Sequence, residues 1–239
     1  MHQYFAGRWL HKSLKKIILI IAVSMPAHFV LGQAPPLQRF YENAKVGYRD
    51  AQGHVTVAAQ YDAGSEFSNG YAIVVQNGRR GYLNAGGQVQ VPLIYRDAQP
   101  FTGGYAAVKL ADRYGFIDES GSWVIQPVYE AVYAFAAGRA LVKKDNLYGF
   151  IDTTLCEVIA PRYRQATGFS EGLALVWETD GRCRFVDSGG KAAIATAFDD
   201  ARPFHGGKAE VLRQGKWYRI DRDGQVLGEL IPQPAAVAP

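Results

Sequence analysis

YAAVKLADRYGFIDESGSWVIQPVYEAVYAFAAG, the stretch from Tyr105 to Gly138, decides the fold because its landmarks recur at a fixed distance before and after it. Its Gly-aromatic-Ile-Asp run closes with an Asp that returns, once as Asn, at steps of 34, 34, 34, 35 and 34 residues. The members of this column are Asp50, Asn84, Asp118, Asp152, Asp187 and Asp221. Such a period indicates an array of units that cannot bury their apolar faces alone.

Other columns of residue types keep the same step. One aromatic column consists of Tyr61, Tyr95, Tyr129, Tyr163 and Phe198. A second consists of Phe67, Phe101, Phe135, Phe169 and Phe204. A Gly lies three residues after each of these phenylalanines. We interpret recurring aromatics such as Tyr129, Phe135 and Phe116 as core or inter-unit packing, because every unit must meet its neighbour in the same way.

Each unit is predicted to form three short strands. The first, Ala106–Lys109, places Ala and the Val two residues on at one face. The second is Gly115–Asp118, and the third is clearest at Trp123–Ile125. We expect the third strand to stop near a proline, which has no backbone N–H for the sheet ladder. The prolines concerned are Pro92, Pro127 and Pro161.

The turn after the second strand has Asp first and Gly fourth, as in Asp118–Gly121. Asp or Asn at the first position can bond the backbone of the turn, and Gly at the fourth accepts a left-handed conformation. We therefore expect the chain to reverse here as a hairpin with a bulge. A calcium site is the alternative for the repeated Asp. One carboxylate per unit is poor for calcium, which needs several oxygens close together.

The repeat predicts an all-β protein of about six three-stranded antiparallel units of about 34 residues, arranged as an open superhelical stack. A β-propeller-like closed ring is the alternative, although three strands are one short of a usual blade. Helical arrays share this period, but here fixed Gly positions and short Val, Ile, Tyr and Phe runs leave no window with the periodicity of two helices.

These units resemble the WG repeat, also called the KWG repeat, over about Tyr41 to Leu227. The family pattern is Trp-Gly-aromatic-Ile-Asp, two residues, Gly, an apolar pair, Pro and a Tyr-Asp-like pair before Phe and Gly. In this chain Tyr114-Gly115 and Tyr148-Gly149 replace Trp-Gly, whereas Trp217 is kept without its Gly. The resemblance implies a β-rich repeat domain of largely undefined activity in bacterial proteins, with no catalytic residues to transfer.

The first 32 residues are predicted to be a secretory signal peptide, cleaved after Gly32. Basic residues up to Lys16 precede the apolar run from Ile17 to Val23. An uncleaved anchor is the alternative, but Pro26 interrupts a stretch already short of the roughly 20 apolar residues of a membrane span. We expect a linker at 33–37, a WG-like β-repeat domain at 38–230 and a disordered C-terminal tail at 231–239. The predicted location is secreted or periplasmic.

The net charge of +4 arises in this leader, since four of the 26 basic residues precede Gly32 and the remaining 22 match 22 acidic residues. A strongly basic nucleic-acid surface is therefore not indicated. The two cysteines, Cys156 and Cys183, lie in neighbouring units. An oxidising compartment permits a disulfide between them, although their places in the repeat suggest too large a separation. Both pairing and non-pairing remain open at this stage.

Catalytic and metal signatures are sparse. His54 and His205 occupy different repeat positions, no histidine pair has metal spacing, and neither a nucleophile elbow nor a phosphate-binding Gly loop occurs. We expect no cofactor, no metal and no enzyme activity. An acid-pair hydrolase, which needs no local motif, is the least favoured alternative. Arg79-Arg80, Lys143-Lys144, and Arg182 with Arg184 are interpreted as solvated charge near turns.

Aromatic residues outside the columns are the candidates for binding, because no neighbouring unit requires them. They are Trp123, Tyr133, Trp177 and Trp217. We predict an exported, non-catalytic binding or scaffolding protein with a protein partner. A glycan-binding module is the alternative, since carbohydrate binding uses exposed aromatic faces.

Overall fold

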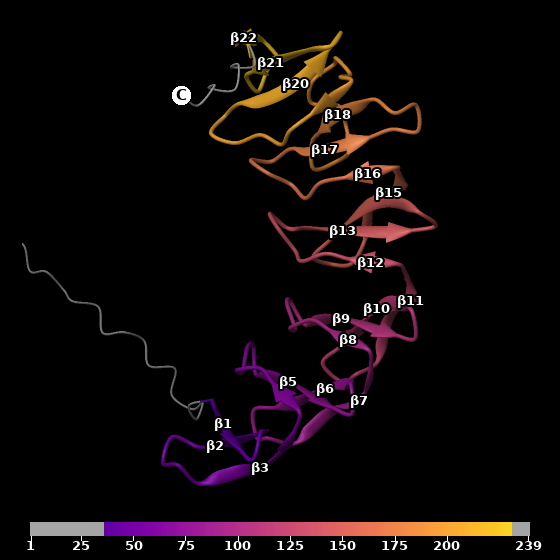
Figure 1. Cartoon of the computed structure of the whole chain (residues 1–239). Helices are drawn as coiled ribbons and strands as arrows, with labels where there is room; N and C mark the ends of the chain where they lie inside the picture. The colour runs from indigo at the N-terminus through magenta and orange to yellow at the C-terminus, as the bar shows by residue number, and fades with distance from the viewer. Residues whose placement is uncertain (1–35, 231–239) are drawn as a thin grey trace, which may run out of the picture. The chain divides into compact units, whose positions relative to one another are not determined.

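The computed structural model describes residues 36–230. The predicted signal peptide, most of the predicted linker and the predicted tail lie outside these residues. The described chain forms 22 strands in six antiparallel sheets that follow one another along the sequence (Figure 1). Within it no helix has the length and hydropathy to cross a membrane. The all-β prediction and the 34-residue repeat are confirmed.

The sheets share one plan, a meander of three long strands, preceded in most of them by a strand of two residues. The first sheet contains β1 (Gln38–Glu42), β2 (Lys45–Arg49) and β3 (Val55–Tyr61). The second contains β4 (Ala63–Gly64), β5 (Tyr71–Gln76), β6 (Arg79–Asn84) and β7 (Val89–Tyr95). The third contains β8 (Asp97–Ala98), β9 (Tyr105–Leu110), β10 (Arg113–Asp118) and β11 (Trp123–Tyr129).

The remaining sheets repeat this plan with one exception. The fourth sheet contains β12 (Ala131–Val132), β13 (Arg139–Lys144), β14 (Leu147–Asp152) and β15 (Glu157–Tyr163). The fifth contains β16 (Gln165–Ala166), β17 (Ala174–Trp177) and β18 (Cys183–Val186). The sixth contains β19 (Asp200–Ala201), β20 (Ala209–Arg213), β21 (Lys216–Ile220) and β22 (Val226–Glu229). In the fifth sheet, isolated bridges from Ala192 and Phe198 replace the third long strand.

The third strands pass through their prolines, so the expectation that they stop there is wrong. β7 continues past Pro92 to Tyr95, and its pairing with β6 shifts register between the Tyr82–Val91 and Arg80–Tyr95 pairs. Two features permit this. β7 lies at the edge of its sheet, so one side of its backbone has no ladder partner, and the bulge absorbs the missing N–H.

The bulge also explains the glycine of the Tyr-Gly pairs. A Cβ atom on Gly115 would lie 2.5 Å from the carbonyl oxygen of Ile125 in β11, and one on Gly149 would lie 2.5 Å from that of Ile159 in β15. Contacts of that length are far inside van der Waals distance. Only glycine therefore lets the bulged third strand cross so close to the second strand.

The turns with Asp first and Gly fourth form as predicted. Asp118 Oδ1 accepts hydrogen bonds from the backbone N–H groups of Ser120 at 2.9 Å and Ser122 at 3.0 Å, and Gly121 has φ +83°. The Ser120 hydroxyl and these backbone donors hold the pKa of Asp118 below its usual value. This oxygen is thus engaged by the turn itself.

The core lies between successive sheets. Tyr82 and Val91 of the second sheet form one buried cluster with Val108 and Ile117 of the third. Phe116, on the opposite face of the third sheet, belongs to a cluster that continues into the fourth. The column residues Tyr129 and Phe116 are buried as predicted, whereas Phe135 packs against its cluster while partly exposed.

Turn glycines bring the sheets together. A Cβ atom on Gly87 would lie 2.6 Å from Val57 Cγ2, and one on Gly224 would lie 2.7 Å from Ile194 Cγ2. Each turn therefore packs against the third strand, or its replacement, in the preceding unit. Between residues 36 and 230, no hydrogen bond, ion pair or hydrophobic cluster joins the first sheet to the sixth, as a closed ring would require.

Candidate functional site

A hollow of about 490 Å³ lies where the second sheet meets the third. Its walls come from the start of β6, the end of β7 and the hairpin between β9 and β10. The residues that line it are Arg79, Leu93, Ile94, Arg96, Leu110 and Ala111. Arginine and aliphatic side chains thus share one concave surface.

The aliphatic part of the hollow is open to solvent. Ile94 is 48% exposed and Leu110 is 36% exposed, in a chain whose other large apolar residues are mostly buried. Ile94 lies next to the last residue of β7, and Leu110 is the last residue of β9. Contiguous exposed apolar surface beside polar side chains is typical of interaction sites, whereas single exposed apolar residues are ordinary surface.

The two arginines of the hollow differ in their contacts. Arg96 Nη1 lies 2.8 Å from Asp112 Oδ1, whereas Arg79 donates only to the carbonyl oxygen of Ile94 at 3.3 Å. No carboxylate pairs with Arg79 in the described chain. The hollow therefore presents a cation that is not neutralised locally.

In the preceding unit, the position equivalent to Arg96 is occupied by an acidic residue, Asp62. Asp62 Oδ1 lies 2.5 Å from Lys45 Nζ, and its Oδ2 accepts the backbone N–H of Asn77 at 2.7 Å. The Lys45 bond and then the Asn77 bond hold the pKa of Asp62 below its usual value. Arg96 occupies this position one unit later, so the hollow is where the repeat exchanges a carboxylate for a guanidinium.

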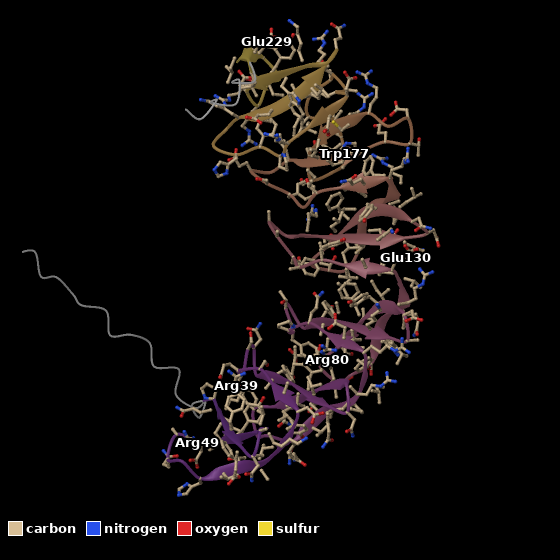
Figure 2. The ribbon with its side chains drawn as sticks, viewed as in Figure 1. Arg39, Arg49, Arg80, Glu130, Trp177 and Glu229 are labelled. Carbon is tan, nitrogen blue, oxygen red and sulfur yellow. The ribbon has the colours of Figure 1, made fainter. Side chains whose placement is uncertain are left out.

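Glu130 supplies the acid at the junction of the third and fourth sheets, where its hairpin donor, Asn146, lies one residue after the position equivalent to Asn77. It pairs with Arg113 at 3.2 Å and Lys143 at 3.4 Å, and it accepts the N–H of Asn146 at 3.1 Å. Glu130, labelled in Figure 2, lies between β11 and β12, where the third sheet meets the fourth. The Asn146 N–H, with help from Lys143 and Arg113, holds the pKa of Glu130 below its usual value.

The four aromatic residues predicted to bind are dispersed over four sheets. Trp123 packs against the cluster between the second and third sheets, with its ring centroid 5.9 Å from that of Tyr95. Trp177 packs against the cluster between the last two sheets. Trp217 carries the Arg202 guanidinium 5.2 Å above its ring. Each of the three is partly buried.

Tyr133 is the exposed member of the four, at 47%. No ring contact within residues 36–230 joins two of these aromatics, and none of them lines the large hollow. The structure therefore does not gather them into one surface. Burial and a nearby Tyr148 hydroxyl raise the pKa of the Tyr133 phenol.

A second hollow, of about 350 Å³, lies in the sixth sheet. Arg202 and Arg219 both pair with Glu210 there, at 2.5 Å and 3.7 Å, which neutralises much of its charge. Its lining is Arg202, Pro203, His205, Lys208, Ala209, Glu210 and Arg219. It lacks the exposed aliphatic side chains of the first hollow.

The cysteines and acids were also candidates for chemistry. Both thiols are free: Cys156 is exposed, while Cys183 is buried and burial raises its pKa to about 12. Burial and this pKa make Cys183 a poor nucleophile. Among the described residues, no group of three or more His, Cys, Asp or Glu side chains could hold a metal ion.

A family profile described as WG containing repeat matches the chain five times, at residues 47–79, 81–114, 114–148, 148–176 and 184–217. The chain belongs to the WG-repeat family. Each match begins in the second long strand of one sheet and ends in the first or second long strand of the next sheet. The Gly that gives the family half of its name is the one crossed by the bulged third strand. No curated protein is significantly similar to this WG-repeat chain.

Several solved structures align at low similarity. A computationally designed protein, Ika8, has a TM-score of 0.38 at 14% identity over 81% of this chain and 73% of its own. BamB from Moraxella catarrhalis gives 0.39 at 14% over 81% and 69%. Apo AztD from Citrobacter koseri gives 0.41 at 12% over 82% and 72%. At these TM-scores the likenesses carry no functional conclusion.

Sequence reasoning missed the large hollow because it treated Arg79 as solvated charge and did not single out Ile94, Arg96 or Leu110. A signal was present. The residue after each buried aromatic of the first column is acidic in three units and arginine in two. The members of this junction column are Asp62, Arg96, Glu130, Arg164 and Asp199.

Proposed function

We propose that this WG-repeat protein is an exported, non-catalytic binding or scaffolding protein whose partner is another protein. The observation that supports it is the hollow between the second and third sheets. It combines the exposed aliphatic residues Ile94 and Leu110 with the guanidinium of Arg79. Protein-binding surfaces commonly combine an apolar centre with arginine, which is enriched at interfaces.

The location of the partner follows from the predicted signal peptide. Protein expressed with residues 1–32 should be recovered outside the cytoplasm with Gln33 at its N-terminus, as measured by intact mass. Recovered material that still contains Lys15 and Lys16 would contradict cleavage after Gly32. This experiment examines export alone and is independent of the binding site.

The binding function is tested with a double variant, Ile94→Asp and Leu110→Asp, used as bait for cross-linking and mass spectrometry in extracts of secreted and periplasmic protein. Exposed aspartates should remove the apolar contact, so the proteins captured by the natural chain should be lost. Val55→Asp is the matched control, because Val55 is 60% exposed and lies outside the hollow.

Two results would contradict this proposal. Equal capture by the natural chain and the double variant would show that the hollow is not the binding surface. Turnover of a peptide or glycan panel that is lost on changing a single Asp or Glu would indicate a hydrolase. Retention of the chain on a glycan array, lost in Tyr133→Ala, would favour the glycan-binding alternative, since Tyr133 is the exposed member of the four predicted aromatics.

A further inference from the structure

We propose that the hollow binds a partner's carboxylate in the position that Asp62 and Glu130 fill at neighbouring junctions. The ligand is an extended protein segment in which an Asp or Glu is flanked by aliphatic residues. The Arg79 guanidinium and the Ala111 N–H hold the carboxylate, and Ile94 and Leu110 contact its aliphatic neighbours. This proposal rests on the protein-binding function proposed above.

The junction between the first and second sheets, called the first junction, supplies the template for these donors. There Lys45 Nζ and the Asn77 N–H converge on the Asp62 carboxylate at 2.5 Å and 2.7 Å. Arg79 and Ala111 are the residues found 34 positions after Lys45 and Asn77, and both line the hollow. The junction of the second and third sheets thus keeps a cation and a hairpin N–H at a place where residues 36–230 supply no carboxylate.

The hairpin of the third sheet has the geometry needed to present that N–H. Ala111 has φ +52°, close to +51° at Asn77 and +52° at Gln214. At the last junction the Gln214 N–H donates to Asp199 at 2.8 Å. No acceptor is found for the Ala111 N–H among residues 36–230. An alanine in the left-handed region keeps a tip conformation that Asn and Gly adopt more readily.

No acidic side chain of residues 36–230 fills this place. Arg96 stands where the acid would be and lies 2.8 Å from Asp112, an exposed residue outside the hollow's lining. A guanidinium cannot accept a hydrogen bond. An acceptor from outside can therefore bond Arg79 and the Ala111 N–H together, and a carboxylate also matches the charge of the guanidinium.

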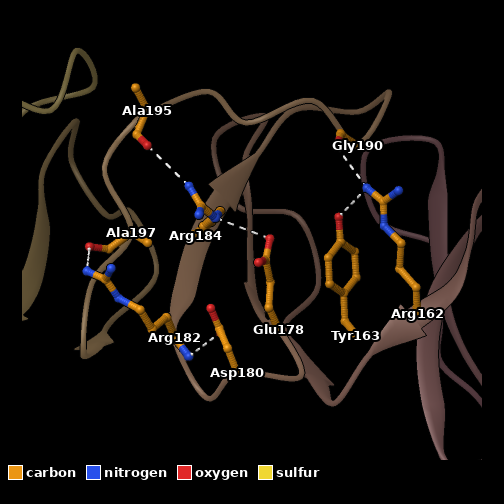
Figure 3. Close-up of polar contacts among 9 residues, drawn as sticks. All are labelled: Arg162, Tyr163, Glu178, Asp180, Arg182, Arg184, Gly190, Ala195 and Ala197. Carbon is orange, nitrogen blue, oxygen red and sulfur yellow. Dashed lines mark hydrogen bonds and ion pairs between the residues drawn. The ribbon is translucent and has the colours of Figure 1, made fainter.

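The fourth junction, which also has an arginine, shows why the absence of the acid does not make a site there. Arg164 replaces the acid, but the residue equivalent to Arg79 is Leu147, so this junction has no cation at that position. The hairpin is longer and carries its own acids (Figure 3). Glu178 pairs with Arg184 at 3.1 Å, and Asp180 accepts the Arg182 N–H at 2.9 Å.

Two peptide libraries provide the probe. Their members are short, with mixed Leu, Ile, Val and Ala around one fixed central residue and solubilising Ser at both ends. The libraries differ only in that residue, Glu or Gln. Binding to the purified protein is measured by fluorescence anisotropy, and the Ala111 amide is followed by nitrogen-resolved NMR. We expect the Glu library to bind about tenfold more tightly than the Gln library and to shift the Ala111 amide.

The decisive variant is Arg96→Asp, which restores the acid of the first junction inside the chain. It should reduce binding of the Glu library by about tenfold or more, while the Tm stays within about 2 °C of the natural chain because the new carboxylate meets Arg79 and the Ala111 N–H. Arg164→Asp is the matched control. It makes the same charge change in the same column and should leave binding within about twofold.

The outcomes separate the two proposals. Equal binding of the Glu and Gln libraries, no binding by either, or full binding by Arg96→Asp would overturn the carboxylate site. Equal losses in Arg96→Asp and Arg164→Asp would also overturn it, by showing that only net charge matters. In each of these cases, loss of partner capture by the Ile94 and Leu110 double variant would still support protein binding through the aliphatic wall.

Discussion

Residues that pack between the sheets and residues at the edge formed by the hairpins vary differently from one unit to the next. Between the sheets, equivalent positions keep the same residue type, as in Val57, Val91 and Ile159. At the hairpin edge the charge of the equivalent residue changes sign, from Asp62 to Arg96 to Glu130. Packing against a neighbour constrains the first region in every unit. The second region meets solvent, so each unit can acquire its own chemistry there.

The strongest test of the interior is Phe150→Ala. Phe150 is fully buried between the fourth and fifth sheets, with its ring centroid 4.9 Å from that of Phe169. Its truncation should cost about 3 to 5 kcal/mol in the free energy of unfolding, measured by urea denaturation. Phe135→Ala should cost less, because Phe135 is partly exposed. Equal losses of unfolding free energy in Phe150→Ala and Phe135→Ala would mean that burial does not distinguish the two positions.

Gly149→Ala tests the crossing of the second strand by the bulged third strand. The added Cβ would lie 2.5 Å from the Ile159 carbonyl oxygen, and we expect a loss of about 1 to 3 kcal/mol in thermal or urea unfolding. Gly168→Ala is the control, because a Cβ there has no atom within 4 Å. If both variants lose the same stability, the close approach is not what requires glycine.

Acid should weaken the turns in a defined pH range. The folded pKa of Asp118 lies below its ordinary value near 4, so its stabilising contribution is present above about pH 4 and is lost as the pH falls through the folded pKa. Asp118→Asn keeps an acceptor, as Asn84 does in the same column. The Tm of this variant, followed from pH 6 to 2 by circular dichroism, should decline less than that of the natural chain. An identical decline would exclude Asp118 as a contributor.

The smallest effect is expected at the edge. Tyr133→Ala should change the Tm by no more than about 2 °C, because the side chain is largely exposed. Trp123→Ala should lower it further, since Trp123 packs against the cluster between the second and third sheets and against Tyr95. Differential scanning fluorimetry of the two variants compares edge with interior directly. A larger loss in Tyr133→Ala would contradict the division between them.

Sequence periodicity predicted the long strands and the Asp-Gly turns because these depend on residue type at fixed spacing. It did not reveal β12, whose two residues are too few to show an alternation, or the irregular end of the fifth sheet after Val186. The proline rule gave the wrong strand ends because it neglected that β7 is an edge strand able to bulge at Pro92.

The candidate site was less accessible to sequence reasoning. Arg79 and Ala111 are 32 positions apart, and only the stacking of the second and third sheets brings both into the lining of one hollow. Aromatic residue type was the wrong guide there, because Trp123 breaks the pattern yet fills a gap in the core. A reversal of charge within a column, as at Arg96, was the informative signal.

The turn glycines bear on the order in which the chain folds. Gly87 meets Val57, and Gly224 meets Ile194, so each junction is completed by residues about one unit apart and needs nothing from the far end of the protein. Contacts of such short sequence separation favour fast folding. A ribosome that has released two complete units has released everything their junction requires, and later units can add to that nucleus in the order of their synthesis.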